Sequence, residues 1–239
     1  MKKSTLAILL LLASICSYAQ TPSAGRATLN EQSVVRDSAG VQLSMAAWQL
    51  LARTGNYWMK VANPGQANPE FILLKLTDQQ KAERLSRMDK PAESKFFTTG
   101  GIVEPFKVRD IYGNKVDKKE WAGKTVVLNF WFIGCPPCRA EIPDLNKLAL
   151  KYKDNPNVLF IAIALDEDYN IKDFVKDHPL NYRLAGSGQV FANQFKINLY
   201  PTNVVIDKAG KVLFHYVGGA TNGPYWLDKS IQESEKASL

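Results

Sequence analysis

The sequence predicts an α/β domain built on a central sheet, with a smaller α+β module ahead of it. Strand and helix patterns alternate from about Thr99 onward, which is typical of such a domain. The clearest strand is the run 125–132, whose residues are apolar except for Asn129 and therefore suit a strand buried on both faces. The 239 residues, 46% hydrophobic and 22% charged, suffice for one ordinary domain and a smaller attachment.

The first 19 residues have the pattern of a cleavable export signal. Two lysines follow Met1, an apolar run covers residues 6–13, and small residues precede a cut that we place after Ala19. A membrane anchor is the less favoured alternative, because a spanning helix needs roughly 18 or more apolar residues. Lipidation of Cys16 is another, although Ile15 stands where lipoprotein signals usually have Gly or Ala. We expect export to the periplasm or cell envelope.

The charge pattern argues against a nucleic-acid partner. Loss of the two lysines with the signal would lower the formal charge from +7 to +5. Acidic residues are interspersed, and no basic stripe is interleaved with aromatic residues. We attribute the excess to solubility or to attraction of acidic partners.

Ahead of the main domain the sequence predicts two regions. Residues 20–40 are polar and without periodicity, which favours a flexible leader. Residues 41–90 are expected to form the small α+β module, and residues 90–94 the linker to the main domain at 99–239. The module's expected elements are a helix at 44–53, strands at 57–61 and 71–76, and a helix to about Met88 that Asp78 could cap.

The main domain shows further strands and helices after the strand at 125–132. Apolar runs predict buried strands, helical spacing predicts helices, and Lys208-Ala209-Gly210 reads as a hairpin turn. The expected elements are a helix at 136–153, a strand at 158–165, a helix at 171–176, strands at 203–207 and 211–216, and a last helix from about 225.

The cysteines point to redox chemistry. If Cys16 leaves with the signal, Cys135 and Cys138 are the only cysteines of the mature chain. A structural disulfide framework is then impossible. In an oxidising compartment, a solitary pair two residues apart is better explained by reversible thiol-disulfide exchange.

The two cysteines have different expected roles. Cys135 should lie at a helix entrance, where unpaired N–H groups and a partial positive charge lower the pKa of a thiol. It should be the nucleophile, exposed enough to attack a partner's disulfide. Cys138 lies one turn further on the same face and can resolve the mixed disulfide. Pro136 suits the first helical position, and Pro137 stiffens the loop.

Each alternative use of a CxxC motif requires residues that this sequence lacks. Zinc would need two more ligands, and His178 and His215 lie far apart without ligand spacing. Covalent haem would need His directly after the second cysteine, where Arg139 stands. We therefore expect no metal and no cofactor beyond the redox-active pair, and assign both histidines to surface or sheet packing.

Two segments resemble the TlpA/ResA branch of the thioredoxin superfamily. The first is LNFW at 128–131 leading into CPPCRAEIP at 135–143, and the second is YPTNVVIDKAG at 200–210. The resemblance covers roughly residues 99–235. It implies a thioredoxin-like fold, a central mixed sheet flanked by helices, and thiol-disulfide oxidoreductase activity on client proteins. It also favours the reductase direction, with a membrane electron donor of the thiol-disulfide transporter type.

The resemblance further implies where a client binds. The family proline that matches Pro201 is cis and faces the dithiol, and the backbone beside it pairs with the substrate chain. An X-Pro bond is the common place for a cis peptide, although a trans proline at a strand entry is the alternative. Gly134 stands where the family often has Trp, which would leave a flatter, more open surface. The expected client-binding residues are Tyr200, Pro201, Thr202, Gly134, Pro136 and Pro137.

The sequence also predicts roles for three further residues near the cysteine pair. Glu141 matches a family glutamate thought to move protons for the second cysteine, and a buried carboxyl with a raised pKa would suit that role. A solvated glutamate without a role is the alternative. Asn129 occupies the position of thioredoxin's buried acid and cannot take a proton. Trp131 is expected to pack beneath the site.

Two other functions remain open from the sequence. A thiol peroxidase shares this fold, but such a site normally has Thr or Ser three residues before its cysteine, where Phe132 stands. A non-catalytic binding protein would use the N-terminal module and leave the dithiol idle.

Overall fold

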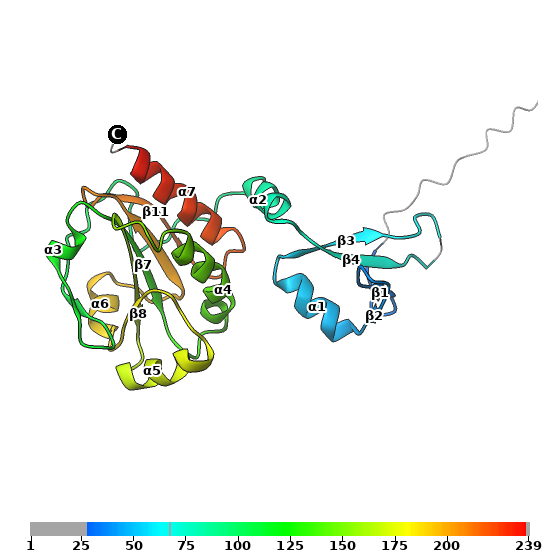
Figure 1. The fold of residues 1–239 in the computed structure, drawn as a ribbon, viewed down its shortest axis with the longest axis horizontal. Helices are drawn as coiled ribbons and strands as arrows, with labels where there is room; N and C mark the ends of the chain where they lie inside the picture. Colours follow the sequence, from blue (N-terminus) through cyan, green and yellow to red (C-terminus); the bar gives the residue numbers. More distant parts are fainter. Residues whose placement is uncertain (1–27, 67, 238–239) are drawn as a thin grey trace, which may run out of the picture. The chain divides into compact units, whose positions relative to one another are not determined.

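The computed structural model describes residues 28–66 and 68–237 (Figure 1). The export signal predicted for residues 1–19 lies outside the described residues. Among the residues described, no helix combines the length and apolarity needed to cross a membrane.

The first of two compact units is built on a small four-stranded sheet. This unit comprises residues 28–50 and 58–74 of the described chain, and its strand order is β2-β1-β4-β3. β1 runs antiparallel to β2 and parallel to β4. The elements of this part of the chain are β1 (Val35–Arg36), β2 (Gln42–Leu43), α1 (Met45–Arg53), β3 (Tyr57–Val61) and β4 (Phe71–Lys75).

The prediction of a flexible leader at residues 20–40 is wrong for the C-terminal end of that segment. Val35 lies within residues 20–40, yet it pairs with Phe71 of β4 and is only 1% exposed. A two-residue strand has too short a pattern to be read from its own sequence. Its partner strand defines it, because β4 supplies the hydrogen bonds and the apolar surface.

The predicted module of residues 41–90 also differs from the structure, because its last helix belongs to the second unit. This helix, α2 (Asp78–Ser86), clusters with residues 75–237. Lys81 Nζ donates to Asp144 Oδ1 at 3.0 Å. The cap is Thr77 rather than Asp78: Thr77 and Gln80 form a capping box, in which each side chain accepts from the other's backbone N–H.

The segment predicted as a linker, residues 90–94, is packed against the second unit. Ser94 is buried, and its backbone N–H donates to His215 Nδ1 at 3.0 Å. The ammonium of Lys90 lies over the rings of Phe214 and Trp226. These contacts tie the segment to β11 and α7.

The second unit has the expected mixed sheet flanked by helices. Its five strands have the order β11-β10-β7-β8-β9. β7, β8 and β9 are parallel, and β10 is antiparallel to both of its neighbours. Besides α2, its elements are β5 (Val108–Arg109), β6 (Lys115–Val116), α3 (Lys118–Trp121), β7 (Thr125–Trp131), α4 (Pro136–Lys151), β8 (Val158–Ala164), α5 (Asp168–Asp177), β9 (Arg183–Ala185), α6 (Gln189–Gln194), β10 (Thr202–Ile206), β11 (Val212–Val217) and α7 (Gly223–Lys236).

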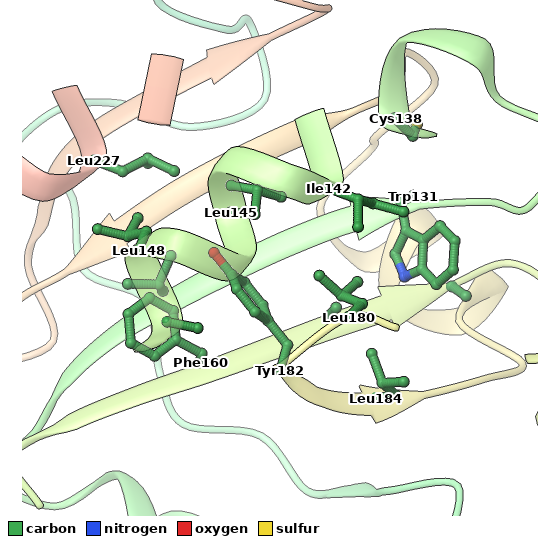
Figure 2. Packing of buried hydrophobic residues seen from close by; sticks show 14 of the residues in the cluster. Trp131, Cys138, Ile142, Leu145, Leu148, Phe160, Leu180, Tyr182, Leu184 and Leu227 are labelled. Carbon is green, nitrogen blue, oxygen red and sulfur yellow. The ribbon is translucent and has the colours of Figure 1, made fainter. Parts of the chain in front are cut away.

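The central strand β7 is buried on both faces, as its apolar sequence predicts. Val126, Leu128 and Phe130 face one apolar cluster, which α3 and α6 cover. Val127 and Trp131 face the other, which α4, α5 and α7 cover. Figure 2 shows Trp131 in this cluster with Leu145 of α4 and Leu227 of α7. Side chains alternate along a strand, so Asn129 lies on the same face as Val127 and Trp131, toward α4.

Candidate active site

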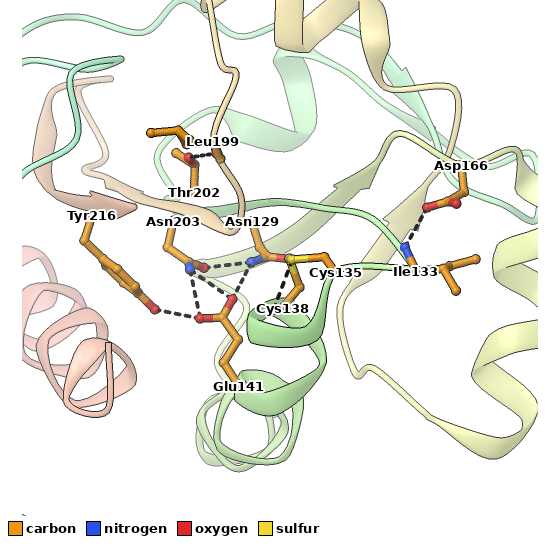
Figure 3. The surroundings of a disulfide bond; sticks show 10 residues. All are labelled: Asn129, Ile133, Cys135, Cys138, Glu141, Asp166, Leu199, Thr202, Asn203 and Tyr216. Carbon is orange, nitrogen blue, oxygen red and sulfur yellow. Dashed lines mark hydrogen bonds between the residues drawn. A yellow bond between two sulfur atoms is a disulfide. The ribbon is translucent and has the colours of Figure 1, made fainter. Parts of the chain in front are cut away.

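The two cysteines lie where the central strand passes into the first long helix. β7 ends at Trp131, and Cys135 is the N-cap of α4 in an extended conformation. Its sulfur is bonded to that of Cys138, and the Cys138 backbone N–H points at Cys135 Sγ at 3.2 Å (Figure 3). The same N–H and the helix N-terminus would stabilise a thiolate on reduced Cys135.

The expectation that Cys135 is exposed is wrong for this disulfide-bonded state. Cys135 and Cys138 are each 2% exposed and belong to the apolar cluster beneath α4. In the bonded pair, Cys135 shares that cluster with Cys138 and Trp131 instead of projecting into water. Its sequence neighbours Gly134 and Pro136 are exposed, so the disulfide lies close beneath the surface.

The segment at the start of β10 borders the same place. The Tyr200–Pro201 peptide is cis, as the resemblance implied. The Tyr200 ring meets that of Phe132 edge-on, with centroids 5.5 Å apart. Thr202 directs its hydroxyl to the Leu199 carbonyl at 2.8 Å, so this side chain serves the turn itself.

Glu141 is held in a buried polar cluster assembled from four elements (Figure 3). Its Oε1 accepts from the side-chain amides of Asn129 on β7, at 3.0 Å, and Asn203 on β10, at 3.1 Å. Its Oε2 accepts from the hydroxyl of Tyr216 on β11 at 3.1 Å. Asn129 also donates to the Asn203 side-chain oxygen at 3.0 Å. We call these four residues the carboxyl cluster.

Burial controls the ionisation of Glu141. The residue is 7% exposed, and removal from water raises its pKa to about 7, against the opposing hydrogen bonds from Asn203, Tyr216 and Asn129. No Lys or Arg in the described part of the chain forms an ion pair with it. Glu141 is therefore not a solvated glutamate, and it can exchange a proton near neutral pH.

An apolar groove of about 680 Å³ opens beside Cys135. Gly134 and Pro136 line its near end, and Phe174 contributes apolar surface. His178 lies at its rim as an exposed residue, with Nε2 3.2 Å from the Arg139 guanidinium. The remaining lining residues are Ala140, Ile142, Pro143, Asn146, Asp177 and Pro179.

Comparison with known proteins assigns the family. The family model Redoxin matches residues 102–231, which is more than half of the chain and includes both cysteines and the cis proline. The chain belongs to the Redoxin family. ResA thiol-disulfide oxidoreductases of Bacillus thuringiensis strain Al Hakam and Bacillus anthracis are each 39% identical to it over 132 residues, covering 54% of this chain and 76% of each relative.

Two solved structures are similar to more than half of this chain. A candidate thiol:disulfide interchange protein DsbE from Chlorobium tepidum is 27% identical with a TM-score of 0.52, covering 58% of this chain and 98% of that one. A candidate protein disulfide isomerase from Bacteroides thetaiotaomicron is 26% identical with a TM-score of 0.55, covering 62% and 95%. The fold is thioredoxin-like, and this Redoxin-family protein is a thiol-disulfide oxidoreductase.

Several residues near the disulfide were not identified from the sequence. Asn203 carried a weak signal, as a polar residue within an apolar strand, whereas Tyr216 and Asp166 carried none. Gly219 also borders the site: a Cβ built there would lie 3.1 Å from the Pro137 Cβ. The histidines are placed as expected, His178 at the surface and His215 within the sheet.

Asp166 anchors the loop that leads to Cys135. Its Oδ2 accepts from the Ile133 backbone N–H at 2.8 Å (Figure 3), and the neighbouring Leu165 N–H bonds the Trp131 carbonyl at 3.1 Å. Both contacts join the end of β8 to the residues just before Cys135.

Replacing Asp166 by Ala should therefore loosen this loop. The Ile133 N–H would lose its acceptor, and we expect a loss of about 1 kcal/mol in the free energy of unfolding, measured by urea denaturation, together with slower disulfide reduction. Asp166→Asn keeps a side-chain oxygen in place and serves as the matched control. Equal losses in the two variants would contradict the anchoring role.

Proposed function

We propose that this Redoxin-family protein is exported and reduces disulfides in proteins of the cell envelope through Cys135 and Cys138. The observation that carries the proposal is a cysteine pair at a helix N-terminus, with the buried carboxyl of Glu141 one turn further along the same helix. Burial raises the pKa of this carboxyl to about 7. Export rests on the signal pattern of residues 1–19. Protein recovered from the envelope should then begin at Gln20.

In the first step, the Cys135 thiolate attacks one sulfur of a client disulfide. A bond forms between Cys135 Sγ and that sulfur, and the client's second sulfur leaves as a thiolate. The backbone N–H of Cys138, which points at Cys135 Sγ, stabilises the attacking thiolate before the bond forms.

In the second step, Cys138 releases the client. Its thiol passes a proton to the carboxylate of Glu141, and the resulting thiolate attacks Cys135 Sγ. The Cys135–Cys138 disulfide forms, and the client's first sulfur leaves as a thiolate. The client has gained two electrons and the enzyme has lost two. A pKa near 7 suits Glu141 to accept the proton and then pass it on.

The client chain is proposed to lie along Tyr200, Pro201 and Thr202 and over Gly134, Pro136 and Pro137. The Pro201 carbonyl already accepts from the Gly218 N–H at 2.8 Å. Tyr200 makes no backbone hydrogen bond within the described chain, so its N–H and C=O are the groups left to pair with a client. The enzyme is then returned to the dithiol by two electrons from a membrane donor of the thiol-disulfide transporter type.

Reduction of insulin tests the dithiol role. With dithiothreitol as electron source, the protein from Gln20 onward should accelerate the precipitation of insulin chains, and Cys135→Ala should precipitate insulin only at the rate of dithiothreitol alone. A thermal melt checks that the variant is folded. Equal rates for the two proteins would overturn the proposal. Rapid loss of thiols to hydrogen peroxide would favour a thiol peroxidase instead.

A further inference from the structure

Tyr216 reaches Glu141 only because a glycine leaves room for it. The Tyr216 side chain is fully buried on β11, and its hydroxyl donates to Glu141 Oε2 at 3.1 Å (Figure 3). Gly223, at the start of α7, lies against this ring. A Cβ built on Gly223 would lie 2.5 Å from the Tyr216 hydroxyl oxygen and would also overlap the ring carbon that bears it.

Position 223 requires glycine because a side chain would not fit there, not because the backbone needs glycine's conformational freedom. Gly223 does not adopt a positive φ, so an L-residue would fit its backbone. Real Cβ atoms do not approach other atoms so closely, so a Cβ at this position would force the Tyr216 ring to shift within a close-packed core. A side chain at position 223 would therefore displace the phenol from Glu141.

Tyr216 is a dependable donor to the carboxyl. Burial, followed by the adjacent charge of Glu141, raises the pKa of Tyr216 well above its usual value, so the phenol keeps its proton. Of the two carboxyl oxygens, Oε1 is bonded by both amides, whereas Oε2 depends on Tyr216 and on a longer 3.3 Å contact from Asn203. Loss of the phenol would leave Oε2 poorly bonded.

We propose that Tyr216 and Gly223 form a positioning pair for Glu141, in which the tyrosine hydroxyl holds Oε2 and stabilises the ionised carboxylate while the glycine provides the space for that hydroxyl. A donor to a carboxylate favours its charged form. The pair thus sets the lowest pH at which Glu141 can take a proton from Cys138. The link to catalysis rests on the proposed role of Glu141, whereas the positioning itself does not.

The chain offers a matched control in Tyr182. This second tyrosine is also buried in the cluster beneath α4 (Figure 2), but its hydroxyl has no hydrogen-bond partner among the described residues. Tyr216→Phe and Tyr182→Phe remove the same atom from the same core. Tyr182 lies within reach of the Glu141 charge but gives it no hydrogen bond, so only Tyr216→Phe removes a donor to Glu141.

The test is an NMR titration of the Glu141 side-chain carboxyl in the oxidised protein, without client or reductant. Tyr216→Phe should raise the midpoint by about one pH unit, Gly223→Ala should raise it similarly, and the double variant should add little to either. Tyr182→Phe should leave it near the wild-type value. If Gly223→Ala does not fold, the two tyrosine variants still decide the matter. An unchanged midpoint in Tyr216→Phe, or an equal shift in Tyr182→Phe, overturns the proposal.

The pH profile of insulin reduction separates this inference from the proposed function. If the midpoint and the rising limb of the profile move together, the pair acts on the Cys138 step. If the midpoint moves and the profile does not, the positioning of Glu141 stands, and its role as proton acceptor fails.

Discussion

Replacing Cys138 by alanine is expected to hold client proteins on Cys135 as mixed disulfides. In the proposed mechanism, attack on the client uses Cys135 alone. Release uses the Cys138 sulfur, which is close enough to bond Cys135 directly. Without that sulfur the intermediate waits for an external thiol. Envelope extracts from cells making the variant should show high-mass bands on non-reducing gels that disappear with dithiothreitol, and mass spectrometry of the bands identifies the clients.

The control for trapping is the double variant Cys135→Ala, Cys138→Ala. Once the predicted signal with Cys16 has been removed, this variant has no thiol left and should capture nothing. Exchanging only Cys135 should also abolish capture, because Cys135 is the N-cap of α4 between the exposed Gly134 and Pro136, whereas Cys138 lies one turn into the helix. Bands of equal strength from Cys135→Ala would mean that Cys138 is the attacking sulfur, and the assigned order of the two steps would be wrong.

Replacing Glu141 by glutamine is expected to remove a large pH dependence of stability. The folded-state pKa of Glu141 is about 7 against an ordinary value of 4.5, so the folded protein binds this proton more tightly than the unfolded chain does. The stabilisation is full below about pH 4.5, declines as the pH rises, and is lost above about pH 7. Between pH 5 and pH 8 the wild type should lose about 2 to 3 kcal/mol that Glu141→Gln retains.

Urea denaturation of the oxidised protein at pH 5 and pH 8 measures this difference. Glu233→Gln, at an exposed glutamate of α7, is the matched control and should follow the wild type. Glu141→Gln should also slow insulin reduction at pH 7 by about 100-fold, the lower range for loss of a proton-transfer group. A Glu141→Gln protein with the wild-type pH dependence of stability would show that the carboxyl does not titrate near neutrality.

Local pattern was enough to predict most of the fold. The strand that became β7 and the helix that became α4 were predicted to within two residues, because each is long and has a clear apolar pattern. The short elements β5, β6, α3, β9 and α6 were missed, since two to six residues carry too little periodicity. The placement of α2 was also wrong, because its partner Asp144 lies on a helix more than fifty residues away.

By itself, the sequence determined the place of the cysteine pair at the start of a helix and the α/β class, since these depend on residues that are neighbours in the chain. Only the tertiary structure decided the state of Glu141. Asn129, Asn203 and Tyr216 come from three strands, and Gly223 from a fourth element. The burial and the hydrogen bonds of this carboxyl depend on residues that are close in space but distant in sequence. These residues come together only when the sheet and the helices pack.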